Sequence, residues 1–219
     1  MSVPLRPTLQ GIPALLTDGP EHSPVTVVLA HGAGAPMDSP FMQFMATGLA
    51  ERGIRTVRFE FPYMAARRSG PRKPPDRAAI LVQSWEQVIH ALGDPSRLVI
   101  GGKSMGGRIA SMIADDAGVA GLLVLGYPFH APGKPQQTRT RHLQDLRVKT
   151  LILQGTRDAL GSREDVATYS LSRNVQLLWI EEGDHSFKPR ARSGRSEKEN
   201  LEAAVHASAD WVLGLRVAE

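Results

Sequence analysis

Three side chains that could together carry out nucleophilic catalysis occur in this 219-residue chain in the order serine, aspartate, histidine. Ser104 lies in the stretch GGKSMGG, Asp158 follows it by 54 residues, and His185 follows Asp158 by 27 residues. A serine hydroxyl is a weak nucleophile until a histidine takes its proton, and a carboxylate can hold that histidine in the productive tautomer. The three residues therefore predict acyl-transfer chemistry, provided that the fold brings them together.

The residues around Ser104 have the spacing G-x-S-x-G, between an apolar run at residues 97–101 and a helical pattern at residues 105–114. A tight strand-to-helix turn gives the serine strained dihedral angles, and glycines on both sides avoid clashes. The segment Gly102-Lys103-Ser104 also resembles the end of a phosphate-binding loop. That motif needs a glycine five residues before Gly102, where this chain has Arg97, so we favour the nucleophile.

Polar or glycine-rich segments follow three further apolar runs. In the stretch HGAGA at residues 31–35, a backbone N–H could join that of Met105 in an oxyanion hole, although the stretch could also be an ordinary turn. His31 is expected to be a structural hydrogen-bonding residue rather than a base. Asp158 ends the stretch GTRD, where the alternatives are a solvated aspartate or a helix cap.

His185 lies in the stretch EEGDHSF and is the histidine that follows a strand, in a glycine-containing loop, downstream of both proposed partners. His130 is a weaker alternative for the base, whereas the other histidines fit surface or helix-face positions. Glu182 and Asp184 are the next candidates for the acid. Asp184 adjoins His185 and is badly placed to orient it, so hydrogen bonds within the loop are its expected role.

These residues would be positioned by an alternating series of strands and helices. Apolar runs predict strands at residues 24–31, 55–61, 97–101, 119–125, 150–154 and 175–180, and an edge strand at residues 8–16. Helical spacing occurs at residues 39–52, 77–92, 105–114, from about 162, and 197–213. Continuous apolar strands indicate that both sheet faces are covered, so we expect a doubly wound, mostly parallel α/β sheet. Ligands bind such sheets beyond the carboxyl ends of the strands, where the candidate residues lie.

The motifs HGAG, GGKSMGGR, LQGTRD and GDHSF together resemble the small, lid-less bacterial serine hydrolases of the α/β-hydrolase fold, within the dienelactone-hydrolase-like group. The chain is also similar to the hydrolase-like domain of an animal histone-acetyltransferase-complex subunit and its testis-expressed relative. This resemblance implies one domain over residues 1–219 with its core at about 24–215. It implies Ser104 as the nucleophile, His185 as the base, Asp158 as its orienting acid, and the N–H groups of Ala33 and Met105 as oxyanion donors. True dienelactone hydrolases use cysteine, which this chain lacks.

Composition and segment lengths limit the kinds of site and the location that we expect for this protein. The absence of cysteine excludes disulfide scaffolds and thiolate metal sites, and no cluster has metal-ligand spacing, so we expect neither a metal nor a cofactor. No apolar run reaches the length of a membrane span and no signal peptide is evident, so a cytoplasmic protein without a membrane partner is expected. Only about twenty residues, 127–146, separate two predicted strands where lidded lipases insert a cap. An open site for small esters or thioesters is therefore expected.

Basic residues are concentrated in three loops that follow predicted strands. Residues 64–77, 128–142 and 186–198 have net charges of +4, +3 and +4, whereas the whole chain has +4. The sequence thus predicts a positive rim that would favour anionic esters, unless these arginines merely solubilise the loops. Nucleic-acid binding is disfavoured because the loops lack interleaved aromatic residues. The main alternative to an enzyme is a non-catalytic binding or scaffold protein with this fold.

Overall fold

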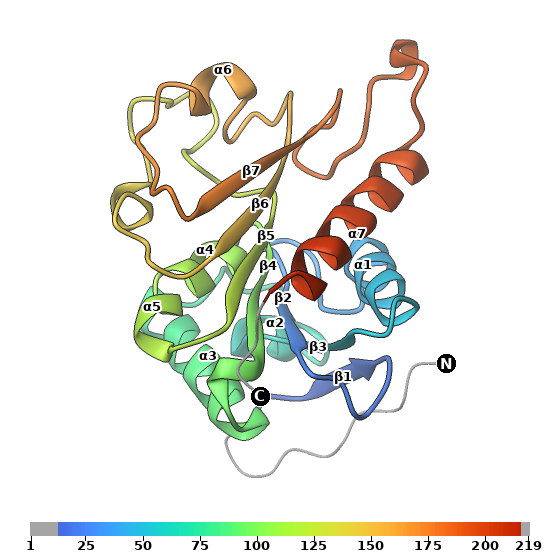
Figure 1. The fold of residues 1–219 in the computed structure, drawn as a ribbon. Coiled ribbons are helices and arrows are strands. Elements are labelled where there is room, and N and C mark those ends of the chain that lie inside the picture. The colour runs from blue at the N-terminus through green and yellow to red at the C-terminus, as the bar shows by residue number, and fades with distance from the viewer. Residues whose placement is uncertain (1–12, 216–219) are drawn as a thin grey trace.

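A computed structural model describes residues 13–215. Seven strands form one sheet in the order β1-β3-β2-β4-β5-β6-β7 (Figure 1). The strands are β1 (Leu15–Asp18), β2 (Thr26–Ala30), β3 (Arg55–Phe59), β4 (Leu98–Lys103), β5 (Gly121–Leu125), β6 (Thr150–Gly155) and β7 (Val175–Ile180). All neighbouring pairs are parallel except β1 and β3. The predicted doubly wound, mostly parallel sheet is therefore confirmed.

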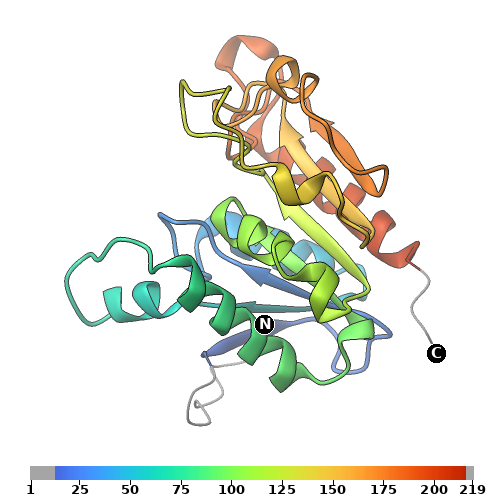
Figure 2. The same cartoon turned by 90° about the vertical axis from the view of Figure 1, so that its left-hand side faces the viewer.

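Helices cover both faces of this sheet (Figures 1 and 2). The α-helices are α1 (Pro40–Ala50), α2 (Pro62–Arg67), α3 (Ala78–Leu92), α4 (Met105–Ser111), α5 (Ala114–Ala117), α6 (Arg163–Val166) and α7 (Glu197–Leu213). Short 3₁₀ turns occupy Pro95–Arg97, Arg141–Leu143 and Ala191–Ser193. Helices α1 and α7 pack on one face, and α3 and α4 pack on the other.

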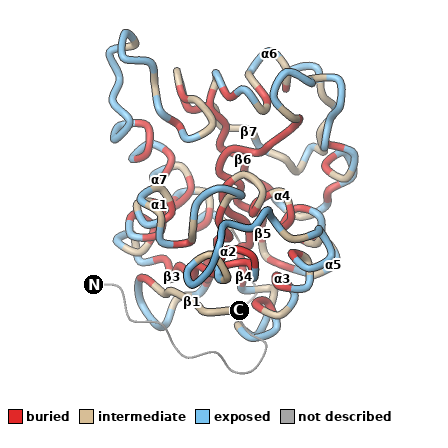
Figure 3. The backbone as a smooth tube through the Cα atoms, turned by 180° about the vertical axis from the view of Figure 1, so that it is seen from behind, coloured by how far each residue is buried: buried red, intermediate tan, exposed pale blue. Residues whose placement is uncertain are grey.

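Each sheet face has its own apolar core, and Figure 3 shows the buried strands between helices that are partly buried and partly exposed. Within β4, Val99 packs toward α1 and α7, whereas Ile100 packs toward α3 and α4. The buried side chains of β2, β4, β5 and β6 alternate between these two cores. This pattern explains why the central strands have continuous apolar sequences: both of their faces are removed from water.

The edge strand differs from its predicted place. Residues 8–12 of the strand expected at 8–16 lie outside the described residues, and β1 forms at Leu15–Asp18, antiparallel to β3. At its end, the buried Asp18 carboxylate pairs with Arg58 on β3, with 2.7 Å between Oδ2 and Nη2. This ion pair links the edge strand β1 to β3.

Several helices are shorter than their sequence patterns predict. The helix expected at residues 105–114 ends at Ser111, whose hydroxyl donates 2.6 Å to the Arg108 carbonyl and competes with the helical backbone. The helix expected from about residue 162 is one turn, begun by a Ser162–Asp165 capping box. Helix α2 was not predicted, although Pro62 occupies the first turn, where proline favours a helix.

Between β5 and β6, the described chain contains one 3₁₀ turn, Arg141–Leu143, and no cap domain. The expectation of a lid-less fold is therefore confirmed.

Candidate active site

Ser104 lies in the turn that joins β4 to α4. Its backbone has φ 50° and ψ −115°, a conformation that residues with a side chain rarely adopt. A Cβ atom added at Gly106 would lie 2.5 Å from the Ala30 carbonyl oxygen and 2.6 Å from that of His31. Glycine is therefore required two residues after the serine, because α4 begins directly against the end of β2. The sharp turn predicted from G-x-S-x-G is present.

His185 and Asp158 complete a continuous chain of hydrogen bonds with this serine. The Ser104 hydroxyl lies 2.8 Å from Nε2 of His185, and Nδ1 of His185 lies 2.7 Å from Oδ2 of Asp158. With the proton on Nδ1 donated to the carboxylate, Nε2 is free to accept the serine proton. Ser104 follows β4, Asp158 follows β6 and His185 follows β7. The parallel sheet therefore brings Ser104 and His185 together at one edge, although 81 positions separate them in the chain.

Asp158 is fully buried, and both of its carboxylate oxygens accept hydrogen bonds from groups other than His185. Oδ2 also accepts from Nε2 of Gln154 at 2.9 Å, and Oδ1 accepts from the backbone N–H of Leu160 at 2.8 Å. Such bonds compensate the desolvation of the buried carboxylate and fix its orientation toward His185.

Gln154 is a site residue that the sequence reasoning missed. It is fully buried on β6; its side-chain oxygen accepts from Tyr127 N–H at 2.7 Å, and its amide donates to Asp158 and to the Gly161 carbonyl. The available signal was a single amide at the end of the apolar run TLILQ, since a buried polar side chain needs partners nearby.

The turn that follows β2 is held in place by His31 and Tyr63. Nδ1 of His31 donates to the Gly32 carbonyl at 2.7 Å, and Nε2 accepts from the Phe61 N–H at 3.1 Å. The Tyr63 hydroxyl donates to the Ala33 carbonyl at 3.1 Å. Burial lowers the pKa of His31 and raises that of Tyr63 to about 12, so both side chains keep these neutral roles. The predicted structural role of His31 is confirmed.

This turn lies beside the serine because β2 pairs with β4. Ala30 is in register with Gly102, and a Cβ at Gly32 would come within 3.7 Å of the Ser104 Cβ. The backbone after β2 is therefore adjacent to the serine, where a donor to a developing oxyanion would have to lie.

The alternative acids and bases lie outside the hydrogen-bonded chain. Glu182 pairs with Arg190, which lowers the pKa of its carboxyl group. Asp184 accepts from the backbone N–H groups of Ser186 and Lys188 at 2.7 and 3.0 Å, as the loop role predicted for it requires. His130 is buried with Nδ1 against the Ala131 carbonyl.

The chain matches the alpha/beta hydrolase domain family over residues 23–213. It belongs to that family.

Three solved structures share its fold at low sequence identity. A serine hydrolase homologue from Coxiella burnetii has a TM-score of 0.70 and 21% identity, and the match covers 94% of this chain and 98% of that chain. An α/β serine hydrolase without lid from Xanthomonas campestris has a TM-score of 0.67 and 21% identity, with 94% and 91% covered. A dienelactone hydrolase from Anabaena variabilis has a TM-score of 0.68 and 20% identity, with 99% and 97% covered. The resemblance to lid-less, dienelactone-hydrolase-like proteins is thus confirmed, and the similarity to the animal complex subunit stays a prediction.

The basic loops of this alpha/beta hydrolase domain are partly neutralised. Figure 2 shows the loops around residues 70 and 135 projecting on the same side of the molecule. Arg68 pairs with Glu60 and Asp38, Arg190 with Glu182, and Lys198 with Glu202. The other basic side chains of the three loops form no ion pair with a carboxylate of residues 13–215: Arg67, Arg72, Lys73, Arg77, Lys134, Arg139, Arg141, Lys188, Arg192 and Arg195.

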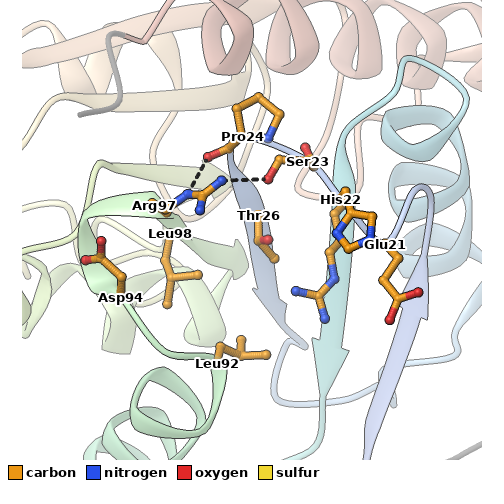
Figure 4. Close-up of a pocket in the computed structure, with 10 residues that line it drawn as sticks. Glu21, His22, Ser23, Pro24, Thr26, Leu92, Asp94, Arg97 and Leu98 are labelled. Atoms are coloured by element: carbon orange, nitrogen blue, oxygen red, sulfur yellow. Dashed lines mark hydrogen bonds between the residues drawn. The ribbon is translucent and has the colours of Figure 1, made fainter. Parts of the chain in front are cut away.

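Two hollows of the hydrolase domain lie away from the serine. One, of about 490 Å³, lies at the amino ends of β2, β3 and β4 among residues that include Ser23, Arg55 and Arg97 (Figure 4). The other, of about 520 Å³, lies between α1 and α7. No three His, Asp or Glu side chains within residues 13–215 are grouped as a metal site would require. Over the same residues, no helix is long and apolar enough to cross a membrane.

Proposed function

We propose that this protein is a serine hydrolase that cleaves small carboxylic esters or thioesters through an acyl-enzyme on Ser104. The observation that carries the proposal is the unbroken chain of hydrogen bonds from Ser104 through His185 to the buried Asp158. The solved structures of serine hydrolases with the same fold support it.

In the first half of the proposed reaction, Oγ of Ser104 attacks the carbonyl carbon while Nε2 of His185 takes the hydroxyl proton. Asp158 keeps the proton of Nδ1 in place and stabilises the imidazolium that forms. The backbone N–H groups of Ala33 and Met105 are proposed to bind the oxyanion. Met105 begins α4, so its N–H is one of the free donors at the helix start.

His185 then returns its proton to the leaving alcohol or thiol, and the carbon–oxygen or carbon–sulfur bond breaks. Water, deprotonated by the same Nε2, attacks the acyl-enzyme, and collapse of the second tetrahedral intermediate releases the acid and restores Ser104. The short connection between β5 and β6 supports small, accessible substrates because no cap encloses a long acyl chain.

A fluorophosphonate probe and a panel of small esters test the proposal. We expect labelling at Ser104 alone, with hydrolysis that is lost in Ser104→Ala while the variant keeps its fold. Labelling at another residue, or full turnover by Ser104→Ala, would overturn the assignment. A protein that keeps its fold but neither reacts nor turns over would instead fit the non-catalytic scaffold.

A further inference from the structure

Lys103 is a buried lysine at the end of β4, directly before Ser104. The residue is 9% exposed. Its ammonium nitrogen lies 5.4 Å from the ring centre of Phe41 on α1 and 6.0 Å from that of Phe187, in the loop after β7. A cation withdrawn from water needs compensating contacts, and aromatic faces supply only part of them.

The main polar partner of this ammonium group is the backbone of the candidate base. Nζ of Lys103 donates to the backbone carbonyl of His185. Gly126, which follows β5, lies directly beside this bond: a Cβ there would lie 2.9 Å from Nζ and 3.0 Å from the His185 carbonyl oxygen. The end of β4, the end of β5 and the loop after β7 therefore meet at this hydrogen bond.

The loop that carries His185 needs such support because its backbone is strained. Glu182 and Phe187 both have left-handed dihedral angles, with φ of 58° and 68°, which non-glycine residues adopt at a cost. The ends of the loop are held by Arg157, which donates to the Glu182 carbonyl, and by Asn200, which donates to the Phe187 carbonyl. Lys103 holds the loop between these points, at the histidine itself.

We propose that Lys103 is a positioning residue of the hydrolytic reaction, whose ammonium group holds the His185 backbone so that the imidazole stays within hydrogen-bond reach of Ser104. Because Lys103 ends β4 and directly precedes Ser104 in the turn, a single side chain fixes the base relative to the nucleophile. The inference rests on the proposed function, since it assigns Lys103 a part in that reaction.

The charge of Lys103 matters to this role. The carboxylates that attract it are Asp158 after β6 and Asp184 after β7, and His185 is the other titratable group beside it. Burial lowers the pKa of Lys103 to about 8, and the two carboxylates oppose this shift. The charged, positioning form is therefore present below about pH 8 and is lost as the pH rises through that value. A neutral amine makes a weaker bond and is no longer attracted by the carboxylates.

The test compares Lys103→Met, which keeps most of the length of the side chain but has neither donor nor charge, with Lys103→Arg, which keeps donor and charge. Lys149→Met, at an exposed lysine directly before β6 and outside the three basic loops, is the matched control. We would measure kcat and KM for p-nitrophenyl acetate across neutral and alkaline pH, subtracting the rate with Ser104→Ala. We expect Lys103→Met to lower kcat by about 10- to 100-fold with little change in KM, the range associated with a misplaced catalytic group.

The pH profile separates positioning from a merely structural role. Wild type should lose kcat above about pH 8. Lys103→Arg should recover activity and lack this alkaline decline, and the control should match wild type. A Lys103→Met enzyme with wild-type kcat would overturn the proposal, as would an alkaline decline that Lys103→Arg retains. If Lys103→Met does not fold, the comparison of wild type with Lys103→Arg decides.

A spectroscopic readout keeps this inference distinct from the proposed function. The Nδ1 proton of His185, bonded to Asp158, should give a downfield proton resonance in wild type that Lys103→Met loses or shifts and Lys103→Arg preserves. If wild type hydrolyses no ester, the proposed function fails, yet this resonance still shows whether Lys103 positions His185. An unchanged resonance in a folded Lys103→Met protein would refute the inference.

Discussion

Replacing Asp158 by asparagine keeps the shape of the buried side chain but leaves it with one acceptor oxygen where the carboxylate has two. Three donors converge on Asp158: Nδ1 of His185, Nε2 of Gln154 and the N–H of Leu160. If the amide nitrogen takes the place of Oδ1, it faces the Leu160 N–H, and two donors then point at each other with no acceptor between them. If it faces His185, the imidazole must switch its proton to Nε2, which then cannot accept the proton of Ser104.

The size of the expected fall in kcat follows from this conflict between donors. We expect kcat to fall by about 10³- to 10⁴-fold, as in other triads that lose the orienting carboxylate, which corresponds to about 4–5.5 kcal/mol in the activation free energy. KM should change little, because Asp158 is buried and His185 stands between it and the substrate. The donor conflict should also destabilise the fold by about 1–3 kcal/mol.

Steady-state kinetics on a small acetate ester, together with urea unfolding, measure both effects. Asp184→Asn is the control: both of its backbone bonds fall on Oδ1, so an amide oxygen can accept them and most of kcat should remain. The reasoning is refuted if Asp158→Asn keeps kcat within a factor of ten of wild type, or if Asp184→Asn proves the more damaging change.

Three further outcomes are expected. Ser104→Ala should lower kcat by about 10³-fold or more without unfolding the protein; wild-type turnover would move the nucleophile elsewhere. The unpaired basic loop residues should raise kcat/KM for a carboxylate-bearing ester over a matched neutral ester at low salt, and this preference should fade above about 0.1 M salt; a salt-independent ratio would contradict it. Arg58→Ala leaves the buried Asp18 carboxylate without its guanidinium and should lower the free energy of unfolding by about 3–5 kcal/mol; an unchanged urea midpoint would show that the pair contributes nothing.

The sequence predicted the central strands and the convergence of Ser104, Asp158 and His185 for a single physical reason. Apolar runs with both faces buried form parallel strands, and parallel strands deliver the residues that follow them to one edge. The chain order of the three residues was therefore enough to predict which side chains meet, and the hydrogen bonds bear this out.

Side-chain direction was harder to predict. Lys103 was considered only as part of a phosphate-binding pattern, and nothing in the sequence shows that its amine reaches the His185 backbone 82 residues away. Gln154 was read as the last residue of an apolar strand, although it orders Asp158. The early end of α4 depends on Ser111 bonding back to its own helix, a choice that packing decides. Loop charges were countable, but their pairing with Glu60 or Glu182 needed coordinates.

The connection between β5 and β6 supplies none of the three residues of the hydrogen-bonded chain, and most of its hydrogen bonds to other elements lie near its ends, apart from one that the Tyr169 hydroxyl donates to the Pro135 carbonyl. Gly126 bonds back to β6, and the Tyr127 N–H is bound by Gln154. In between, residues 132–134 and 136–139 are largely exposed. Its length can therefore vary without moving Ser104, Asp158 or His185. Segments inserted there could change which acyl or alcohol groups are admitted while the reacting atoms keep their places, so this stretch is the natural place to build new substrate selectivity.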